Sequence, residues 1–375
     1  MAQAHTRPVW AGHPATNDID LAGLTPTIQP IPAVLEALSH PQPGSQALQE
    51  MLLRTRLGTE YRLSERSIAL VADLDAAVAD VAARHRGPLV HFPPDSVSTL
   101  LADRVASSRT VTLLRGPGRD GALALESAAD LPCEGLAIVA SPSDPLGTLL
   151  AANDAVRLAR SCRWLLIDER HADYAGQSLM GLAGEFTNVL VLRSFRARVG
   201  ASSPEVGWAA GSPRALSLLE GVPAALPGPV VQAALAAASD LPAVRALLAT
   251  VRDERSRLYR SLRKLSYLQP LPSWGPFVSA RVEVGQRSVL TQALADRGIR
   301  VHAPLQPGLE RYVRFGLGSR RDMEYLRQAL LDSVLTMVGE PSAAGGADAY
   351  GFPLGGEKLG QPEFGQVKQR RQRSA

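Results

Sequence analysis

The stretch VLVLRSFRARVGASSPEVGWAAG, residues 189–211, carries polar side chains in a turn between two apolar strands. A turn of this kind could present a lysine, whose amine can form an imine with a carbonyl compound. The turn instead contains Arg196, Ala197 and Arg198, with no lysine. A guanidinium group stays protonated at any workable pH, so neither arginine can form an imine. Imine chemistry would therefore need an amine from elsewhere in the chain.

Lysine is scarce in the whole sequence. Of the 40 lysine and arginine residues, three are lysines: Lys264, Lys358 and Lys368. Lys264 follows a long helical pattern, and the other two belong to the carboxyl-terminal stretch. We expect none of the three to replace a lysine in the turn at 194–198.

Short apolar strands surround this turn. They are expected at 88–92, 110–114, 135–141, 164–168, 188–192 and 206–211, with helical patterns between several of them, as at 74–85 and 149–162. Strands that alternate with helices favour a mostly parallel sheet covered on both faces. The sequence therefore predicts an α/β protein with an N-terminal arm at 1–45, which contains one short helix, and a large domain at 46–240.

A smaller α/β domain is predicted to follow. A helical pattern at 240–266 precedes a strand at 277–284, a helix at 288–298, strands at 299–303 and 312–318, and a closing helix for which Ser319 is a plausible cap. This interdomain helix and small domain span 241–339. Residues 340–375 are aperiodic and rich in Gly, Pro and Ala, so we expect a disordered tail. Its basic end, KQRRQR, is expected to be solvated rather than bound to nucleic acid or an acidic partner.

Length and composition suit a cytoplasmic protein with more than one domain. The chain has 375 residues, of which 45% are hydrophobic, and can bury a substantial core. It contains no run of 18 apolar residues and no basic-then-apolar start, so neither a membrane span nor a signal peptide is expected. Cys133 and Cys162 fit no disulfide framework or metal site and are expected to be thiols in a reducing compartment.

Four segments carry a family resemblance. They are ASPSDPLGT (140–148), WLLIDERHADY (164–174), the stretch 189–211 and YVRFGLGSRRDMEYLRQAL (312–330). In this order they resemble NPNNPTGT, vvvDEAYxeF, vlRTfSKafglaGlRlGy and yLRItvGtreendrliaAL of fold-type-I, pyridoxal-phosphate-dependent aminotransferases of class I/II, most of all histidinol-phosphate aminotransferases. The resemblance extends from about residue 60 to 335. It implies the fold-type-I fold, with a mostly parallel sheet in the large domain.

The resemblance gives possible cofactor contacts to three residues. Asp168 matches the aspartate that pairs with the pyridinium nitrogen and keeps the ring an electron sink; alternatively it hydrogen-bonds locally at a strand end. His171 replaces a tyrosine that contacts the phenolic oxygen, and a histidine can also hydrogen-bond there. Asp144 matches an asparagine that contacts the same oxygen, but a carboxylate would repel a phenolate. Alternatively, Asp144 only belongs to a good turn sequence.

The groups that anchor the cofactor in the family are replaced. The Schiff-base lysine matches Ala197, which can neither form an imine nor move a proton. The arginine eight residues further on, which binds the phosphate, matches Glu205. At an effective dielectric constant of about 20, this exchange of attraction for repulsion costs about 8 kcal/mol. The glycine-rich loop that binds the phosphate at a helix start matches a stretch in which Asp73 is expected to cap the helix itself, namely Val71, Ala72, Asp73 and Leu74.

One substrate-binding position is retained. Arg314 matches the arginine that binds the α-carboxylate of the substrate through a bidentate fork. The alternative is a structural ion pair of Arg314 with Asp168 or Glu205 across the cleft.

These matches favour a pseudoenzyme, an aminotransferase-like protein that does not perform transamination and is expected to hold neither pyridoxal phosphate nor a metal. It would act in regulation or interaction, as a homodimer or as a heterodimer with an active aminotransferase, because the family's active site lies at a dimer interface. Two alternatives stay open. One is a divergent pyridoxal-phosphate-dependent transferase of the histidinol-phosphate or amino-acid type. The other is a sensor whose vacated cleft binds an amino acid or another carboxylate through Arg314.

Overall fold

The large sheet organises the first part of the molecule. The structure, a computed structural model, describes residues 18–26, 29–41, 44–104, 110–112, 131–200 and 206–338. Seven strands form one sheet in the order β2 (Ile68–Val71), β8 (Gly207–Gly211), β7 (Val189–Ser194), β6 (Trp164–Asp168), β5 (Leu136–Ala140), β3 (Leu89–His91) and β4 (Thr110–Thr112). The five strands from β7 to β4 are parallel, whereas β8 is antiparallel to both β7 and β2. The mostly parallel sheet that we expected is confirmed.

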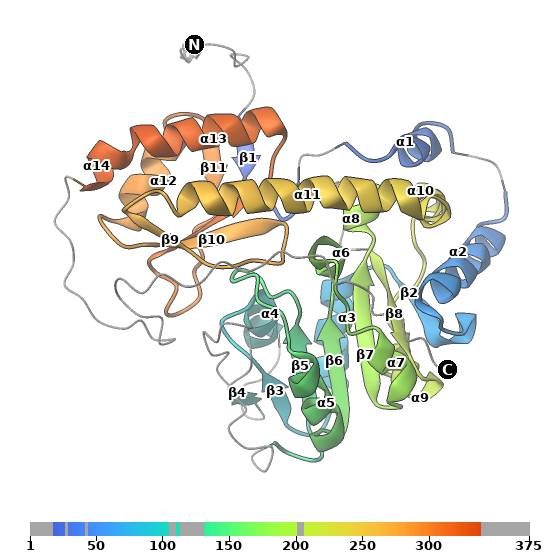
Figure 1. The fold of residues 1–375 in the computed structure, drawn as a ribbon. Coiled ribbons are helices and arrows are strands. Elements are labelled where there is room, and N and C mark those ends of the chain that lie inside the picture. The colour runs from blue at the N-terminus through green and yellow to red at the C-terminus, as the bar shows by residue number, and fades with distance from the viewer. Residues whose placement is uncertain are drawn as a thin grey trace, which may run out of the picture.

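Helices cover both faces of this sheet (Figure 1). One face packs against α2 (Gln46–Tyr61), α5 (Ala152–Ser161), α7 (Gly181–Glu185) and α10 (Gly228–Ser239). The other packs against α3 (Leu74–Arg84), α4 (Ser96–Arg104) and α9 (Pro213–Leu216). Along β6, Leu165 and Ile167 belong to the first core and Leu166 to the second, because successive side chains of a strand point to opposite faces.

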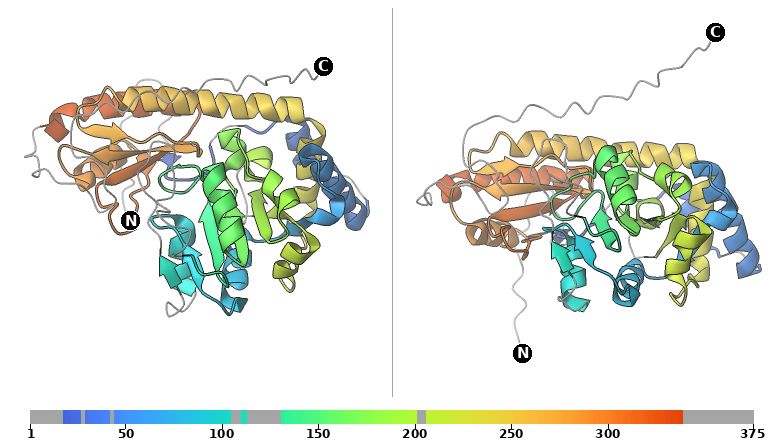
Figure 2. Two further views of the ribbon diagram at one scale, coloured as in Figure 1. Left: turned by 60° about the horizontal axis from the view of Figure 1, so that its bottom comes forward. Right: turned by 90° about the horizontal axis from the view of Figure 1, so that it is seen from below.

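The smaller unit lies along the long helix α11 (Leu241–Leu262) (Figures 1 and 2). Its antiparallel sheet has the order β12 (Tyr312–Gly316), β10 (Phe277–Val282) and β9 (Leu268–Pro270). The remaining helices are α12 (Arg287–Ala295), α13 (Arg320–Asp332) and α14 (Val334–Val338). Ser319 caps α13, as predicted, in a capping box with Asp322. Residues of α11, α13 and the sheet share one apolar core.

The amino-terminal segment packs onto other parts of the chain. Its short helix is α1 (Pro32–Ser39), which lies against α10. The segment also contains a strand that we did not predict, β1 (Ile19–Leu21), which pairs in parallel with β11 (Ile299–Val301) of the small unit. The short strands β2 and β9 were missed as well. The proposed domain boundaries stay a prediction, and the expected tail at 340–375 lies outside the described residues.

No single helix in the described ranges is long and apolar enough to cross a membrane; α10 and α11 meet that criterion only as a pair bent by 93°. Within the same ranges, no group of three His, Cys, Asp or Glu side chains is placed to hold a metal ion.

Candidate functional site

At the end of β6, the side chains of the adjacent residues Asp168 and Glu169 lie on opposite sides of the large sheet. Asp168 closes the strand and pairs with Arg170 on the side of α3, while Glu169 pairs with Arg193 on the side of α2. Both carboxylates are 1% exposed. Strand alternation explains the separation. The two sides are therefore distinct sites. His171 belongs to the Asp168 side, where it is close to Arg170, Asp144 and Arg314.

Asp168 is fully engaged by its own chain. The Nε of Arg170 lies 3.0 and 2.9 Å from the two carboxylate oxygens, its Nη2 lies 2.7 Å from Oδ2, and the backbone N–H of Arg170 donates over 3.1 Å. The same guanidinium contacts Asp75 of α3 through Nη1, at 2.6 Å. Arg170 thus bridges the sheet edge to the first turn of α3. These contacts agree with the alternative that we considered for Asp168, local hydrogen bonding at a strand end.

Arg314 and Asp144 form a buried ion pair. Nη1 of Arg314 donates to Oδ1 of Asp144, and Nη2 donates to the carbonyl oxygen of Ala22 over 2.5 Å. The guanidinium also lies over the ring of Phe277, 5.3 Å from its centroid. We suggested Asp168 or Glu205 as the partner of Arg314. The first suggestion was wrong, because Asp168 pairs with Arg170, whereas Glu205 lies outside the described residues. Asp144, which matches the family's asparagine in the resemblance, is therefore the ion-pair partner of Arg314.

His171 lies between these two ion pairs as a neutral ring. It is 3% exposed and meets Phe277 edge-on, with ring centroids 6.4 Å apart. Burial lowers the pKa of His171 to about 3; Asp144 raises it, and the nearby guanidinium groups of Arg170, Arg196 and Arg314 lower it. The ring is therefore uncharged at neutral pH.

The turn after β7 has no amine to offer. Ala197, 6% exposed, lies in the short helix α8 (Arg196–Val199) and packs into the core shared with the small unit. Lys264 is not close to this turn, since it lines a groove between α11 and α13 with Arg257, Arg260 and Arg320. Among the described residues, no lysine reaches the Asp168 side.

The start of α3 is closed by its own side chain. Asp73 is the N-cap residue, as predicted, and accepts a hydrogen bond from the backbone N–H of Ala76 over 3.0 Å. It is followed by Leu74, which is fully buried. A helix start binds a phosphate through free N–H groups and the helix dipole. Here a carboxylate occupies that position.

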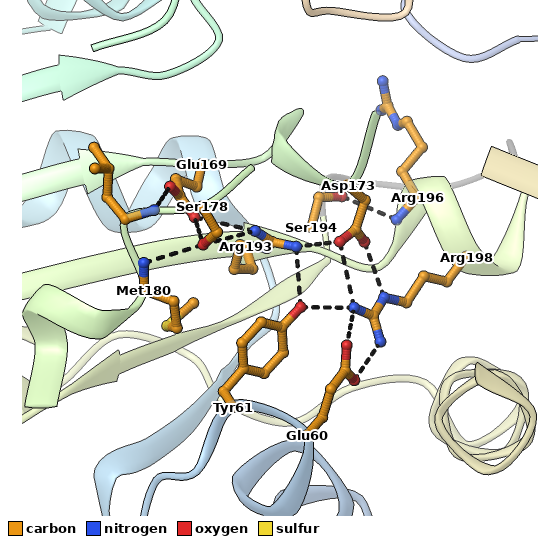
Figure 3. Close-up of polar contacts among 11 residues, drawn as sticks. Glu60, Tyr61, Glu169, Asp173, Ser178, Met180, Arg193, Ser194, Arg196 and Arg198 are labelled. Atoms are coloured by element: carbon orange, nitrogen blue, oxygen red, sulfur yellow. Dashed lines mark hydrogen bonds and ion pairs between the residues drawn. The ribbon is translucent and has the colours of Figure 1, made fainter. Parts of the chain in front are cut away.

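A second ionic network lies on the other side of the sheet (Figure 3). Arg193 bridges Glu169 and Asp173, and Arg198 bridges Asp173 and Glu60. The hydroxyl of Tyr61 accepts from both arginines, over 3.1 and 2.7 Å. Figure 3 shows Arg196 pointing away from this network, although it neighbours Arg198 in sequence.

This network accounts for two motif positions. Glu169 and Arg193 match the glutamate of DEAY and the arginine of RTfSK, and they pair with each other at 3.0 Å. Burial would raise the pKa of Asp173, but the guanidinium groups of Arg193 and Arg198 outweigh it and lower the pKa to about 2. Burial raises the pKa of the Tyr61 hydroxyl to about 12. Sequence reasoning missed Glu60, Tyr61 and Asp173, because no local pattern marks partners from separate helices.

Solved structures define the class of fold. The chain superposes on histidinol-phosphate aminotransferase from Sinorhizobium meliloti, in complex with pyridoxal-5'-phosphate, with a TM-score of 0.72 and 21% identity, covering 85% of this chain and 91% of that one. For the enzyme from Clostridium acetobutylicum the TM-score is 0.73 at 14% identity, covering 85% and 99%. The expected fold-type-I, aminotransferase-like fold is confirmed.

The family follows from the sequence comparison. The model of aminotransferase class I and II matches residues 122–330, more than half of the chain, so the chain belongs to this family. It is 28% identical over 198 residues to histidinol-phosphate aminotransferase 2 of Archaeoglobus fulgidus, covering 52% of this chain and 57% of that protein. It is 29% identical over 266 residues to histidinol-phosphate aminotransferase 3 of Mesorhizobium japonicum, covering 66% and 71%. The first match thus spans little more than half of that relative's length.

The residues present do not fit pyridoxal phosphate. Asp168, which would hold the ring nitrogen, already binds the guanidinium of Arg170. At the positions that the resemblance gives to cofactor contacts, Asp144 would present a carboxylate in place of a hydrogen-bond donor, and Asp73 would meet the phosphate at the helix start. Ala197 supplies no amine. These four residues thus leave four separate requirements of the cofactor unmet.

Proposed function

We propose that this chain is a noncatalytic member of the aminotransferase family that acts through interaction or regulation. The observation that carries the proposal is that charged side chains around Asp168 and Asp144 pair with one another. Asp168 and Asp75 are held by Arg170, and Asp144 is held by Arg314. These three carboxylates and two guanidinium groups are thus already paired within the chain.

The two alternatives have less support. A divergent aminotransferase needs an amine beside Asp168, whereas Lys264 lines the groove between α11 and α13. A carboxylate sensor needs Arg314 to be available, but Asp144 and the carbonyl oxygen of Ala22 already accept from its guanidinium. An incoming carboxylate would have to displace a buried ion pair, which leaves Asp144 buried and unpaired at a cost of several kcal/mol.

Reduction with borohydride separates an enzyme from a noncatalytic protein. We expect the purified chain, mixed with excess pyridoxal phosphate, to show no aldimine absorption, and we expect mass spectrometry after reduction to find no lysine labelled stoichiometrically. An active histidinol-phosphate aminotransferase treated in parallel should carry one label per chain. One stoichiometric label on Lys264 that disappears in Lys264→Ala would contradict the proposal.

The partner surface that we propose lies on α2. Leu48, Met51 and Leu52 are 51%, 45% and 42% exposed, and their spacing places them on one face of the helix. Leu38 of α1 is also exposed, at 40%. Clustered exposed apolar side chains mark interaction surfaces. We propose that this surface pairs with a second copy of the chain or with an active aminotransferase in the cytoplasm, where the free thiols of Cys133 and Cys162 would persist.

A double substitution tests this surface. Leu48→Glu with Met51→Glu should weaken dimerisation about 100-fold, because two apolar side chains that the partner would bury become charged. Sedimentation equilibrium measures the change for the chain alone and for its mixture with an active family member. Leu331→Glu with Leu335→Glu, at two exposed leucines of α13 and α14 (54% and 86% exposed), serves as the matched control and should leave association nearly unchanged. A wild-type chain that is monomeric alone and with that enzyme would refute the interaction role.

A further inference from the structure

A groove on the outer side of the small unit lies between α11 and α13. Its volume is about 340 Å³. The lining side chains are Arg257, Arg260 and Ser261 from α11, Lys264 from the turn directly after it, and Arg320, Glu324 and Arg327 from α13. The spacing within each set places its members on one helical face. Five cations therefore converge on one groove from two separate helices, with a single carboxylate among the lining residues.

The charge is balanced at one end of the groove only. Arg327 contacts Glu254 at 2.7 Å and Glu324 at 2.6 Å, and Arg257 lies 3.5 Å from Glu254. In contrast, no carboxylate of the described chain lies within ion-pair distance of Arg260, Lys264 or Arg320. The groove thus has a neutral end and a cationic end.

Arg320 makes the cationic end unusual. It is the first residue of α13, next to the cap Ser319. The amino-terminal end of a helix carries a partial positive charge, so a cation placed there is unfavourable. The capping box already places the Asp322 carboxylate at this helix end, so a bound anion would be attracted by the three side chains and not by the helix end itself.

We propose that Arg260, Lys264 and Arg320 bind a compact phosphate polyanion of the chemical class of pyrophosphate and nucleoside diphosphates. Planar guanidinium forks and an ammonium group are the donors that phosphates take in proteins. An extended nucleic-acid backbone fits less well, because along the groove it would meet the Glu324 carboxylate, which is 74% exposed. This inference is independent of the proposed function.

Binding of inorganic pyrophosphate to the full chain tests the proposal, measured by isothermal titration calorimetry. Arg260→Ala with Arg320→Ala should weaken binding about 100-fold, because each substitution removes a charge-assisted hydrogen bond to the anion and each such bond accounts for roughly a tenfold change in affinity. The matched control is Arg263→Ala with Arg321→Ala, which removes one exposed arginine from the end of α11 and one from α13 but leaves the groove lining intact. The control should bind within about twofold of the wild type, because side chains outside the groove are expected to act independently of the bound anion.

Three outcomes would overturn the proposal. The wild-type chain could fail to bind pyrophosphate at millimolar concentration, or both double variants could weaken binding equally, as expected of diffuse charge. A single-stranded oligonucleotide could also bind more tightly than pyrophosphate and lose affinity in both variants, which would indicate an extended polyanion surface. Equal melting temperatures of the two double variants show that a loss of binding is not a loss of folding.

Discussion

Asp173→Asn should unfold at a much lower urea concentration than the wild-type chain, with a loss of about 3–5 kcal/mol in the free energy of unfolding. Asp173 is the acid shared by Arg193 and Arg198, whose side chains are 3% and 5% exposed. The substitution keeps the shape of the side chain but removes the charge. Glu169 and Glu60 remain as partners, yet two buried guanidinium groups then compete for less negative charge. The loss of stability arises mainly because these buried guanidinium groups are left partly unpaired.

A surface pair provides the control for this result. Asp80 contacts Arg84 at 2.8 Å, and their side chains are 46% and 43% exposed. Asp80→Asn should cost less than about 1 kcal/mol, because solvent screens an exposed pair. If both substitutions had the same small effect in urea titrations, the network of Figure 3 would not stabilise the fold.

The contribution of Asp173 also depends on pH. Its pKa is about 2 in the folded chain and 3.8 as the reference value for an unperturbed aspartate. A depressed pKa contributes stability above the unfolded value, and the contribution is lost as the pH falls through the folded value. The difference between wild type and Asp173→Asn should therefore shrink between about pH 4 and pH 2.

His171→Gln should make the stability of the protein much less sensitive to acid. In the folded chain burial lowers the pKa of His171 to about 3, whereas the unperturbed value is 6.5. Between these two values the unfolded chain binds a proton that the folded chain does not. Stability therefore falls as the pH falls through this window, by about 1.4 kcal/mol for each pH unit. Over the whole window the loss approaches about 5 kcal/mol.

Urea titrations of wild type and variant at pH 7, 6, 5 and 4 measure this difference. Other groups titrate in both proteins, so the difference between the two slopes isolates His171. His302→Gln is a useful comparison, because burial also lowers the pKa of His302 but its side chain is less buried; it should change the slope less. Parallel curves for wild type and His171→Gln would mean that the ring is protonated in the folded chain.

Local patterns predicted much of the framework. The strand at 164–168 appears as β6 with the same bounds, and the pattern at 74–85 appears as α3, Leu74–Arg84. The strand β2, Ile68–Val71, was missed because a four-residue apolar run directly before a helix cannot be distinguished from the helix by its periodicity. Strand β1 was missed because it owes its structure to pairing with β11, 280 residues later in the chain.

The candidate site was predicted only in part. The position of Asp168 at a strand end and the absence of an amine at Ala197 follow from local sequence. The partners of Arg314 and Arg198 do not follow from local sequence. Arg314 binds Asp144 across 170 residues, and Arg198 binds Glu60 across 138. No spacing rule links side chains that separate elements bring together.

The sequence by itself determined which side chains are available: an alanine in the turn after β7, a carboxylate at Asp144 and an arginine at 170 beside Asp168. Only the tertiary structure decided that these charges neutralise one another, because pairing depends on how the sheet edge, α3 and the small unit meet. The sequence determines which charged side chains are present, but packing determines whether a ligand or another side chain of the protein neutralises them.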